Sequence, residues 1–251
     1  MNITKDELEI FSRQLIIKDF DEKSFKNLQK KTVSIIGLGG IGCPLAYYLV
    51  ASGIKKLNLF DNDIIKKHNL NRQILYSIKE IGKKKSLIAK KKLKEVNPKV
   101  LIKSYNLKIN SKNLDLLKDS SIIIDTSDNW KTMKLINKFS VKKNLPLLSA
   151  SAINYDIQII LFENKKNTHL CLDCIFPNKN EPDLARCDTV GILGTAAGLA
   201  GIISAQKTIN FLMKFKQKNN LLTLIDTKSI SISHIKTQKN NKCKLFKKRN
   251  N

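Results

Sequence analysis

Arginine and aromatic residues are scarce in this chain of 251 residues. Only four of its 46 basic residues are arginine, and aromatic side chains make up 6% of the sequence. Proteins that read nucleic acids rely on arginine for bidentate base contacts and on aromatic rings for stacking. The net charge of +25 is carried mainly by lysines spread along the whole chain, which is typical of a solvated surface. We therefore expect no nucleic-acid partner, although this charge favours polyanionic ligands and acidic proteins.

Cysteine is also infrequent, with five residues, of which two form a Cys-x-x-Cys pair at Cys171 and Cys174. This number and spacing suit a metal or sulfur site in a reducing compartment better than a disulfide framework. The first ten residues are polar and acidic and do not resemble a secretory signal. We therefore expect a cytoplasmic protein.

One uncharged run raises the question of a membrane span. Residues 189–205 form a run of 17 uncharged residues, which is the lower limit for a helix that crosses a bilayer. The run contains four glycines and little bulk. This composition favours a buried helix pressed closely against a neighbour, and we expect no membrane association.

Short apolar strands alternate with helical segments over the first 150 residues. Strands are expected at 33–36, 56–60, 100–105, 121–124 and 146–150, and helices at 43–51, 83–95 and 130–143. This alternation predicts a parallel, doubly wound sheet. Residues 155–163 and 221–236 alternate like antiparallel strands. The predicted fold class is therefore α/β: a Rossmann-like, mainly parallel sheet extended by antiparallel strands.

The chain shows no internal repeat and no second core. Residues 1–236 are expected to form a single domain, with a helical N-terminal extension over residues 1–28. Residues 237–251 form a basic C-terminal tail that carries Cys243 and is expected to be loose elsewhere.

Polar motifs follow three of the expected strands. They are the glycine turn 37–42, Asp61 and the pair Asp128-Asn129. Ligands of an open parallel sheet collect outside the carboxyl ends of its strands, so these motifs predict one nucleotide crevice. Glycines allow the backbone to approach phosphates at a helix N-terminus.

The charged residues expected near this crevice are of the types that bind the ribose and the phosphates of a nucleotide. Asp61 can accept both ribose hydroxyls, Arg72 offers a planar fork to phosphate oxygens, and Lys85 offers a point charge. Asp128 is placed to hold Mg²⁺. In contrast, a glycine turn with an acid about twenty residues on most often marks an NAD(P) site. Lys85 can also be a solvated residue at the start of a helix, and Asp125 and Asp128 can be turn formers.

The combination of motifs resembles the ThiF/MoeB/HesA family, relatives of the ubiquitin-activating enzymes. The resemblance covers residues 9–246 and rests on Arg13-Gln14, Gly37–Gly42, Asp61-Asn62-Asp63, Asn69-Leu70-Asn71-Arg72-Gln73, Gly82 with Lys85, Asp128-Asn129, Cys171-Leu172-Asp173-Cys174, and Cys187 followed by a glycine series that ends at Gly201 and Gln206. Such an ordered set of matches is far more specific than the glycine turn alone.

The resemblance implies an enzyme that adenylates the C-terminal glycine of a small ubiquitin-fold sulfur-carrier protein with Mg²⁺ and ATP. The implied ATP site comprises Gly37, Gly39, Gly40, Gly42, Asp61, Asn69, Asn71, Arg72, Lys85, Asp128 and Asn129. Catalytic roles are implied for Arg13, Arg72, Lys85, Asp128 and Cys187. Arg13 would act in the other subunit of a homodimer. The segment 176–182 resembles the thiamine branch more than the molybdopterin branch, so the thiazole carrier is favoured, with the molybdopterin carrier close behind.

The chain departs from the family pattern at two places. Ile10 stands where the family usually has a first arginine. The family's zinc site uses two Cys-x-x-Cys pairs, but here the second pair has Cys243 and Phe246. Structural zinc requires four ligands, so Cys171, Cys174 and Cys243 leave the fourth position to water, a neighbouring side chain or nothing. The alternative is a degenerate site whose cysteines only pack.

The remaining cysteines have different expected roles. Cys187 follows Arg186, which lowers a thiol pKa and suits sulfur transfer from a persulfide donor; a spectator role is the alternative. Cys43 is expected in the core, and the histidines carry no usable signal. Two other functions stay open at this point: an NAD(P)-dependent oxidoreductase, and a nucleotide-binding member of the family without enzymatic activity.

Overall fold

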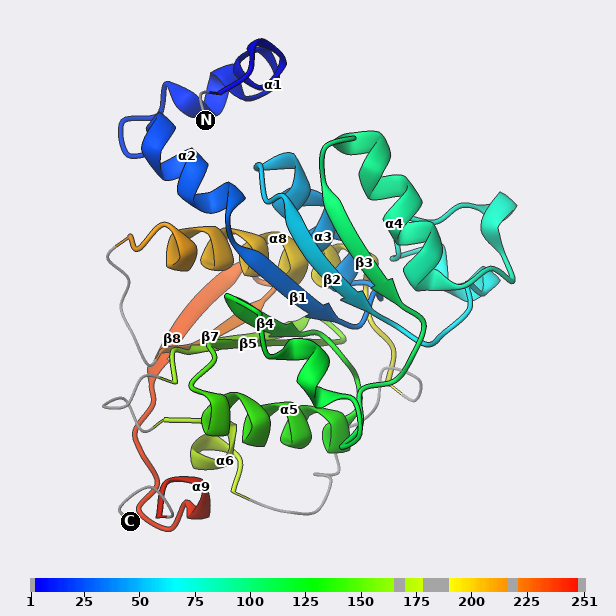
Figure 1. The fold of residues 1–251 in the computed structure, drawn as a ribbon. Coiled ribbons are helices and arrows are strands. Elements are labelled where there is room, and N and C mark those ends of the chain that lie inside the picture. The colour runs from blue at the N-terminus through cyan, green and yellow to red at the C-terminus, as the bar shows by residue number, and fades with distance from the viewer. Residues whose placement is uncertain (1–2, 165–169, 178–189, 216–220, 248–251) are drawn as a thin grey trace.

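The sheet of this protein has eight strands in the order β3-β2-β1-β4-β5-β6-β7-β8 (Figure 1). The computed structural model describes residues 3–164, 170–177, 190–215 and 221–247. The strands are β1 Thr32–Ile36, β2 Lys56–Phe60, β3 Leu101–Tyr105, β4 Ile122–Asp125, β5 Leu147–Ile153, β6 Asp156–Phe162, β7 Leu221–Asp226 and β8 Ser231–Lys236. β1 to β5 pair in parallel, and β6, β7 and β8 pair antiparallel. The predicted fold class is confirmed.

Helices cover both faces of the sheet. They are α1 Lys5–Leu15, α2 Glu22–Gln29, α3 Gly42–Ala51, α4 Lys85–Val96, α5 Trp130–Lys143, α6 Leu172–Ile175, α8 Gly194–Leu212 and α9 Lys244–Lys247, with 3₁₀ turns η1 Lys67–Asn69, η2 Ile78–Glu80 and η3 Leu114–Leu117. One apolar core joins the sheet to α3, α4 and α8, and a second joins it to α5 and α6. In Figure 1 these two layers lie above and below the strands.

Residues alternate along each strand between these two cores. In β1, Ile35 belongs to the core under α3, and the next residue, Ile36, belongs to the core under α5. Both side chains are almost fully buried, with exposures of 0% and 4%. Because neighbouring strand residues point to opposite faces, such runs of consecutive apolar residues identify strands that are covered on both sides.

The N-terminal extension consists of two helices instead of one continuous helical segment. The chain leaves α1 after Leu15, and Asp21 accepts a hydrogen bond from Ser24 N to begin α2. Phe11 packs on Phe25 with 4.7 Å between ring centroids, which holds α1 against α2.

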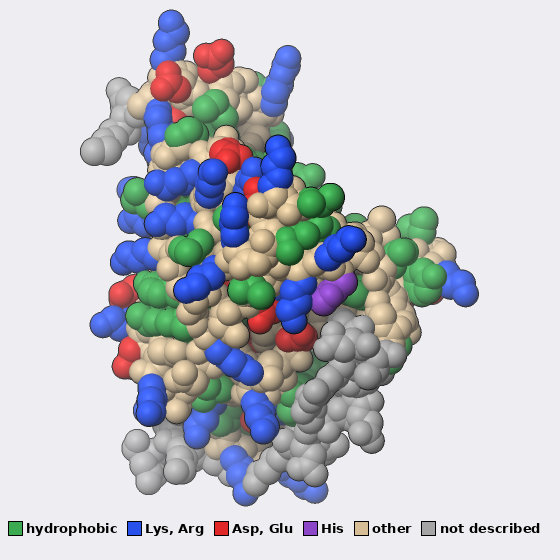
Figure 2. All heavy atoms as spheres, turned by 90° about the vertical axis from the view of Figure 1, so that its right-hand side faces the viewer, with side chains coloured by type: hydrophobic (Ala, Val, Ile, Leu, Met, Phe, Trp, Pro, Cys, Tyr) green, Lys and Arg blue, Asp and Glu red, His purple; other side chains and the backbone are tan. Residues whose placement is uncertain are grey.

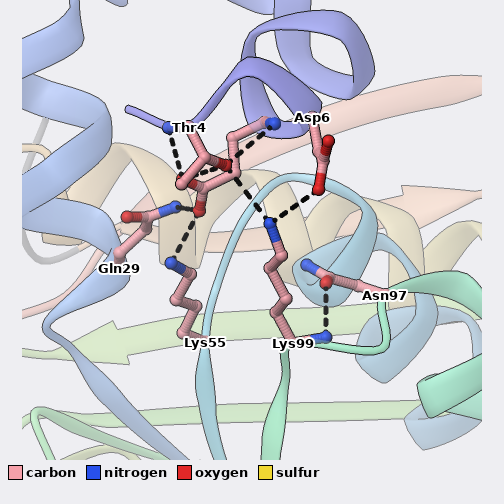
Figure 3. Close-up of polar contacts among 7 residues, drawn as sticks. Thr4, Asp6, Gln29, Lys55, Asn97 and Lys99 are labelled. Atoms are coloured by element: carbon pink, nitrogen blue, oxygen red, sulfur yellow. Dashed lines mark hydrogen bonds and ion pairs between the residues drawn. The ribbon is translucent and has the colours of Figure 1, made fainter. Parts of the chain in front are cut away.

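A polar cluster attaches α1 to the body of the protein (Figure 3). The buried carboxylate of Glu7 accepts hydrogen bonds from Thr4 N (3.1 Å) and Gln29 Nε2 (2.9 Å), and Lys55 Nζ lies 2.6 Å from it. Lys99 Nζ contacts Thr4 Oγ1, at 3.2 Å. These partners come from α2 and from the starts of β2 and β3, so the cluster joins the extension to the sheet.

The glycine-containing helix α8 packs closely against α3. A Cβ atom at Gly201 would lie 2.4 Å from Ile41 O and 2.5 Å from Pro44 Cγ. Such contacts require glycine, and they confirm the expectation of a buried helix for the described residues. No helix in the described ranges is both long and apolar enough to cross a membrane.

The lysines are distributed over the surface. On the face drawn in Figure 2, basic side chains are interspersed with hydrophobic and acidic ones and form no continuous basic stripe. The edge strand β8 is exposed along its length and carries Lys236, and charge on such an edge opposes pairing with other chains.

Candidate nucleotide-binding site

The glycine turn connects β1 to α3 at the carboxyl end of the sheet. Gly37 has a φ of +92°, and a Cβ atom there would lie 2.9 Å from Thr126 O. A Cβ at Gly42 would lie 2.0 Å from Gly37 O. A side chain at either position would therefore open the turn. No described side chain caps the N-terminus of α3, so this end of the helix is suited to hold anionic oxygens.

Asp61 lies directly beside this turn. Its Oδ2 accepts a hydrogen bond from Leu38 N at 2.7 Å, and its Oδ1 accepts one from Asp63 N at 2.8 Å. Burial raises the pKa of Asp61, while the Lys85 ammonium and the two N–H donors oppose that rise. The carboxylate thus fastens the end of β2 to the glycine turn and keeps further lone pairs for a hydroxyl-bearing ligand.

Lys85, at the start of α4, is buried and not solvated. Its exposure is 5%, and its Nζ lies 2.9 Å from Asp63 Oδ2. The Lys85 N–H also donates to Asp63 O at 3.0 Å. The alternative of a solvated helix start is therefore wrong for this residue. A buried ammonium whose ion-pair partner is largely exposed is available to a polyanion.

Arg72 lies over the glycine turn. A Cβ at Gly40 would be 3.3 Å from Arg72 Cγ and 2.9 Å from Ala197 Cβ of α8. Arg72 Nη1 donates to His68 O at 2.9 Å and to Asn71 Oδ1 at 3.0 Å. These two acceptors orient the guanidinium and leave its other N–H groups for a ligand.

Two asparagine side chains near the turn accept hydrogen bonds that shape the local backbone. Asn69 Oδ1 accepts from Lys66 N at 3.0 Å and shapes η1, and Asn129 Oδ1 accepts from Thr132 N at 2.9 Å as the N-cap of α5. Gly39 faces Gln73, since a Cβ there would lie 3.8 Å from Gln73 Nε2. The buried Gln73 Oε1 has no hydrogen-bond partner among the described residues.

The segment after β4 closes the other side of the turn. Thr126 Oγ1 donates to Gly37 O at 2.9 Å, and Ser127 N would lie 3.2 Å from a Cβ at Gly37. Asp125 accepts from Ser127 N and Oγ, and burial raises the pKa of Asp125 to about 6. Asp128, the next residue along, is exposed.

The structure thus brings most of the predicted residues to one edge of the sheet. Arg72 borders the glycine turn at Gly40, and the segment 126–128 borders it at Gly37. Arg13 is not among them, because its neighbour Gln14 donates to the carbonyl of Ala51 at the opposite end of α3. Cys187 lies outside the described residues.

The arrangement fits a nucleoside triphosphate with its cation. A glycine turn that admits no Cβ, an uncapped helix N-terminus, a half-buried arginine and a buried lysine are suited to phosphates. A single exposed carboxylate such as Asp128 suits Mg²⁺ when phosphate oxygens and water supply its remaining ligands. Gln73 Oε1, which has no hydrogen-bond partner among the described residues, adds an acceptor beside Gly39.

Sequence reasoning assigned no binding role to Asp63 or Gln73, and for Asp125 it offered only a turn-forming role, which agrees with the hydrogen bonds from Ser127 N and Oγ. Asp63 ends the motif that begins at Asp61, and Gln73 ends the motif that begins at Asn69. Membership in these motifs is the sequence signal that could have identified both residues. The ion pair of Asp63 with Lys85 joins residues 22 positions apart, and no local pattern marks it.

Three cysteines form a buried group on the other face of the sheet. Cys171 Sγ lies 3.9 Å from Cys174 Sγ and 3.8 Å from Cys243 Sγ. The hydrogen bond from Cys171 lowers the pKa of Cys174 to about 5. Cys43 belongs to the core as expected, since it is fully buried and its thiol donates to Leu38 O at 3.3 Å. Burial raises the pKa of the Cys43 thiol to about 12.

Several known proteins are similar to this chain in sequence or in fold. A sulfur carrier protein adenylyltransferase of Thermus thermophilus is 29% identical over 97% of this chain and 92% of its own length. The adenylyltransferase and sulfurtransferase MOCS3 of Xenopus laevis is 34% identical over 82% of this chain, which spans only 46% of that longer protein. Among solved structures, E. coli MccB with ATP superimposes with a TM-score of 0.82 at 22% identity, over 97% of this chain and 75% of that one. At that identity the likeness concerns the fold alone.

The family model named ThiF matches residues 11–245. This match spans nearly the whole chain, from α1 through the three-cysteine group, and includes the glycine turn and the segments that border it on both sides. The chain belongs to the ThiF family.

Proposed function

We propose that this protein is an adenylyltransferase that activates the C-terminal glycine carboxylate of a small ubiquitin-fold sulfur-carrier protein with ATP. The observation that carries the proposal is the glycine turn, which contacts Arg72 on one side and the segment 126–127 on the other. Family membership and the names of the relatives support adenylyl transfer over the NAD(P)-dependent oxidoreductase that the glycine turn alone would suggest.

The reaction forms one bond and breaks one at the α-phosphorus. A carboxylate oxygen of the carrier attacks this phosphorus, and the bond to the bridging oxygen of the β-phosphate breaks. The products are a carrier acyl-adenylate and pyrophosphate. Because the carrier itself is the nucleophile, the enzyme contributes positioning and charge stabilisation.

Each residue near the glycine turn has a part in this scheme. The turn with Gly37, Gly39, Gly40 and Gly42 holds the phosphates against the N-terminus of α3, and Asp61 accepts the ribose hydroxyls. Arg72 binds phosphate oxygens as a fork, with Asn71 as its support. Lys85 stabilises the charge on the departing pyrophosphate. Asn69 and Asn129 keep the surrounding loops in shape.

Asp128 is the residue that would hold Mg²⁺. Bound with ATP, this ion neutralises the phosphates and the charge that develops on them. The exposed position of Asp128 after β4 leaves its carboxylate accessible to such a shared ion. Asp125 accepts hydrogen bonds from Ser127 and so shapes the segment that carries Asp128.

We propose a homodimer in which Arg13 acts in the site of the partner subunit. Gln14 is bonded to Ala51, the last residue of α3, whereas the glycine turn precedes the first. A helix of ten residues is about 15 Å long, so Arg13 lies far from the turn of its own subunit. Large hydrophobic side chains exposed on and after α1 and near η2, including Ile10, Ile16, Ile17, Ile74 and Ile78, suit a subunit interface.

Sulfur transfer is a separate proposal. The Cys187 thiol would attack the carrier acyl-adenylate with AMP as the leaving group, or would take the outer sulfur of a persulfide donor, which is left as a thiol. The thiamine branch is favoured over the molybdopterin branch by the resemblance of segment 176–182. Among the described residues, Cys43, Cys171, Cys174 and Cys243 form no disulfide, which supports a reducing, cytoplasmic location.

ATP–pyrophosphate exchange tests the proposed activity. Exchange should require a carrier that ends in Gly-Gly and should fall at least about 100-fold in Arg72→Ala and Asp128→Ala. Asp115→Ala, which removes an exposed carboxylate of η3, is the matched control and should retain full exchange. Exchange that is independent of any carrier, or unchanged in Asp128→Ala, would refute the assignment. Mass spectrometry of the carrier should detect an added adenylate.

A further inference from the structure

The three-cysteine group joins segments that are far apart in the sequence. Cys171 is the N-cap of α6 and Cys174 lies within this helix, whereas Cys243 precedes α9 near the C-terminus. Their sulfur atoms lie within 4.8 Å of one another, and their exposures are 0%, 8% and 6%. Apolar residues of the core under α5 surround them. Such a group is shielded from bulk water on most sides.

The spacing of the sulfurs suits a tetrahedral metal ion. A Zn–S bond is about 2.3 Å long, so two thiolates on a tetrahedral ion lie about 3.8 Å apart. The separations here are 3.9 Å for Cys171–Cys174 and 3.8 Å for Cys171–Cys243. Either pair therefore matches an edge of a thiolate tetrahedron.

Hydrogen bonds hold the Cys-x-x-Cys turn in place. The buried Asn137 of α5 accepts from Leu172 N at 3.0 Å and donates to Asp173 Oδ1 at 3.2 Å. Lys134 Nζ lies 2.8 Å from the same carboxylate oxygen. On the other side, Cys243 N donates to Asn240 O at 2.9 Å. Supports of this kind orient metal ligands in proteins, so the site is built by α5 as well as by the cysteines.

The donor set nevertheless differs from that of a closed structural zinc site. Among the described residues, no fourth His, Cys, Asp or Glu joins the three cysteines. In the sequence, Phe246 occupies the position that would complete a second Cys-x-x-Cys pair, and phenylalanine has no ligand atom. Zinc with three protein ligands keeps its fourth position for water or another small molecule.

We propose that Cys171, Cys174 and Cys243 bind one zinc ion through three thiolates, with the fourth position occupied by an exchangeable small ligand. Water fills this position, and small thiols replace it because thiolates are favoured zinc ligands. The ion links α9 to α6, yet it is released more readily than from four protein thiolates. This proposal does not depend on the adenylyltransferase activity.

Cobalt(II) substitution tests the open position directly, because the absorption of tetrahedral cobalt reports the number of its thiolate ligands. The wild-type protein should bind one equivalent and give a three-thiolate spectrum. Adding 2-mercaptoethanol should shift this spectrum toward four thiolates. A spectrum that does not respond to the added thiol, or the absence of cobalt and zinc binding, would overturn the proposal.

Matched variants extend the test. Phe246→Cys should give the four-thiolate spectrum without added thiol and should release zinc to a chromogenic chelator at least about tenfold more slowly than the wild type. Cys243→Ser should lose most zinc binding. Cys43→Ser, which removes a buried thiol of the other core, should behave as the wild type. A disulfide among the three cysteines in protein purified under reductant would contradict the proposal as well.

Discussion

Asp125 ends β4 with no exposed surface, and its Oδ2 has no hydrogen-bond partner in the described part of the chain. Its other oxygen accepts both the N–H and the hydroxyl of Ser127. An ionised carboxylate in such a place costs free energy unless it is fully solvated or paired. Buried carboxylates with a strongly shifted pKa cluster at functional sites. Asp125 lies three residues before the proposed magnesium ligand, Asp128.

This cost predicts a specific pH dependence for Asp125→Asn. The pKa of Asp125 is raised from 3.8 to about 6 in the folded state, so the wild type loses stability as pH rises from about 4 to about 6. The variant lacks this loss, because an amide does not titrate. The difference in free energy of unfolding, variant minus wild type, should therefore increase by about 3 kcal/mol over this window.

Urea denaturation at several pH values between 4 and 7 measures this difference. Asp115→Asn, at an exposed carboxylate, is the control and should follow the wild type throughout. Parallel stability profiles for Asp125→Asn and wild type would show that the buried carboxylate carries no such cost.

At the scale of elements, the packing of α8 on α3 provides a matched pair of substitutions. In Gly201→Ala the new methyl group would meet Ile41 O at 2.4 Å, whereas nothing lies within 4 Å of a Cβ at Gly198. Overpacking of this kind costs about 1–3 kcal/mol. Gly198→Ala should instead stabilise α8 by up to about 1 kcal/mol, since alanine favours helices.

Ile41 precedes α3 and belongs to the glycine turn, so the first substitution should also affect the site. ATP affinity, measured by calorimetry, should fall in Gly201→Ala and stay at the wild-type value in Gly198→Ala. Equal stability and affinity of the two variants would contradict the close contact between these helices.

The attachment of α1 depends on Glu7. Burial by itself raises the pKa of this carboxylate, but hydrogen bonds from Lys55, Thr4 and Gln29 outweigh it and lower the pKa from 4.5 to about 2. The stabilisation is therefore complete above about pH 4.5 and is lost as pH falls toward 2. Glu7→Gln should lack it at neutral pH, at a cost of up to about 3 kcal/mol.

Hydrogen exchange of the α1 amides detects this change even when the rest of the protein stays folded. Exchange in α1 should be faster in Glu7→Gln than in the wild type at pH 7, and the two should converge near pH 2–3. Glu95→Gln removes an exposed ion pair with Lys92 in α4 and should leave α1 unchanged. Unchanged protection of the α1 amides from exchange in Glu7→Gln would show that Glu7 does not attach α1 to the body of the protein.

At the scale of the whole molecule, local patterns in the sequence account for the parallel half of the sheet. Apolar segments such as 122–124 are fully buried, and the polar residue Asp125 follows where the chain leaves the sheet. The glycine turn, Asp61 and Asp128 were predicted to converge for this reason, because parallel strands end at one edge.

Other features depend on contacts between distant residues and have no local pattern. The ion pair of Lys85 with Asp63 and the approach of Cys243 to Cys171 join residues 22 and 72 positions apart. The exposed break between α1 and α2 was also missed, since both flanking segments have helical composition. The boundary between the domain 1–236 and the tail 237–251 stays a prediction.

The position of Arg13 makes the proposed dimer testable by complementation. If Arg13 serves the partner's site, Arg13→Ala and Asp128→Ala each inactivate the homodimer, but a mixed dimer regains one intact site. That site takes Asp128 from one subunit and Arg13 from the other. Subunits that exchange freely form mixed dimers as about half of the population, so activity should recover to about a quarter of the wild-type value.

Pyrophosphate exchange after co-refolding or co-expression of the two variants measures this recovery, and light scattering on the same samples establishes that dimers form. Co-expression of Arg72→Ala with Asp128→Ala is the control. Both residues border the glycine turn of one subunit, so every site of the mixed dimer lacks one of them and activity should stay absent. If Arg13 acted within its own subunit, the Arg13→Ala mixture would stay equally inactive, and the shared site would be excluded.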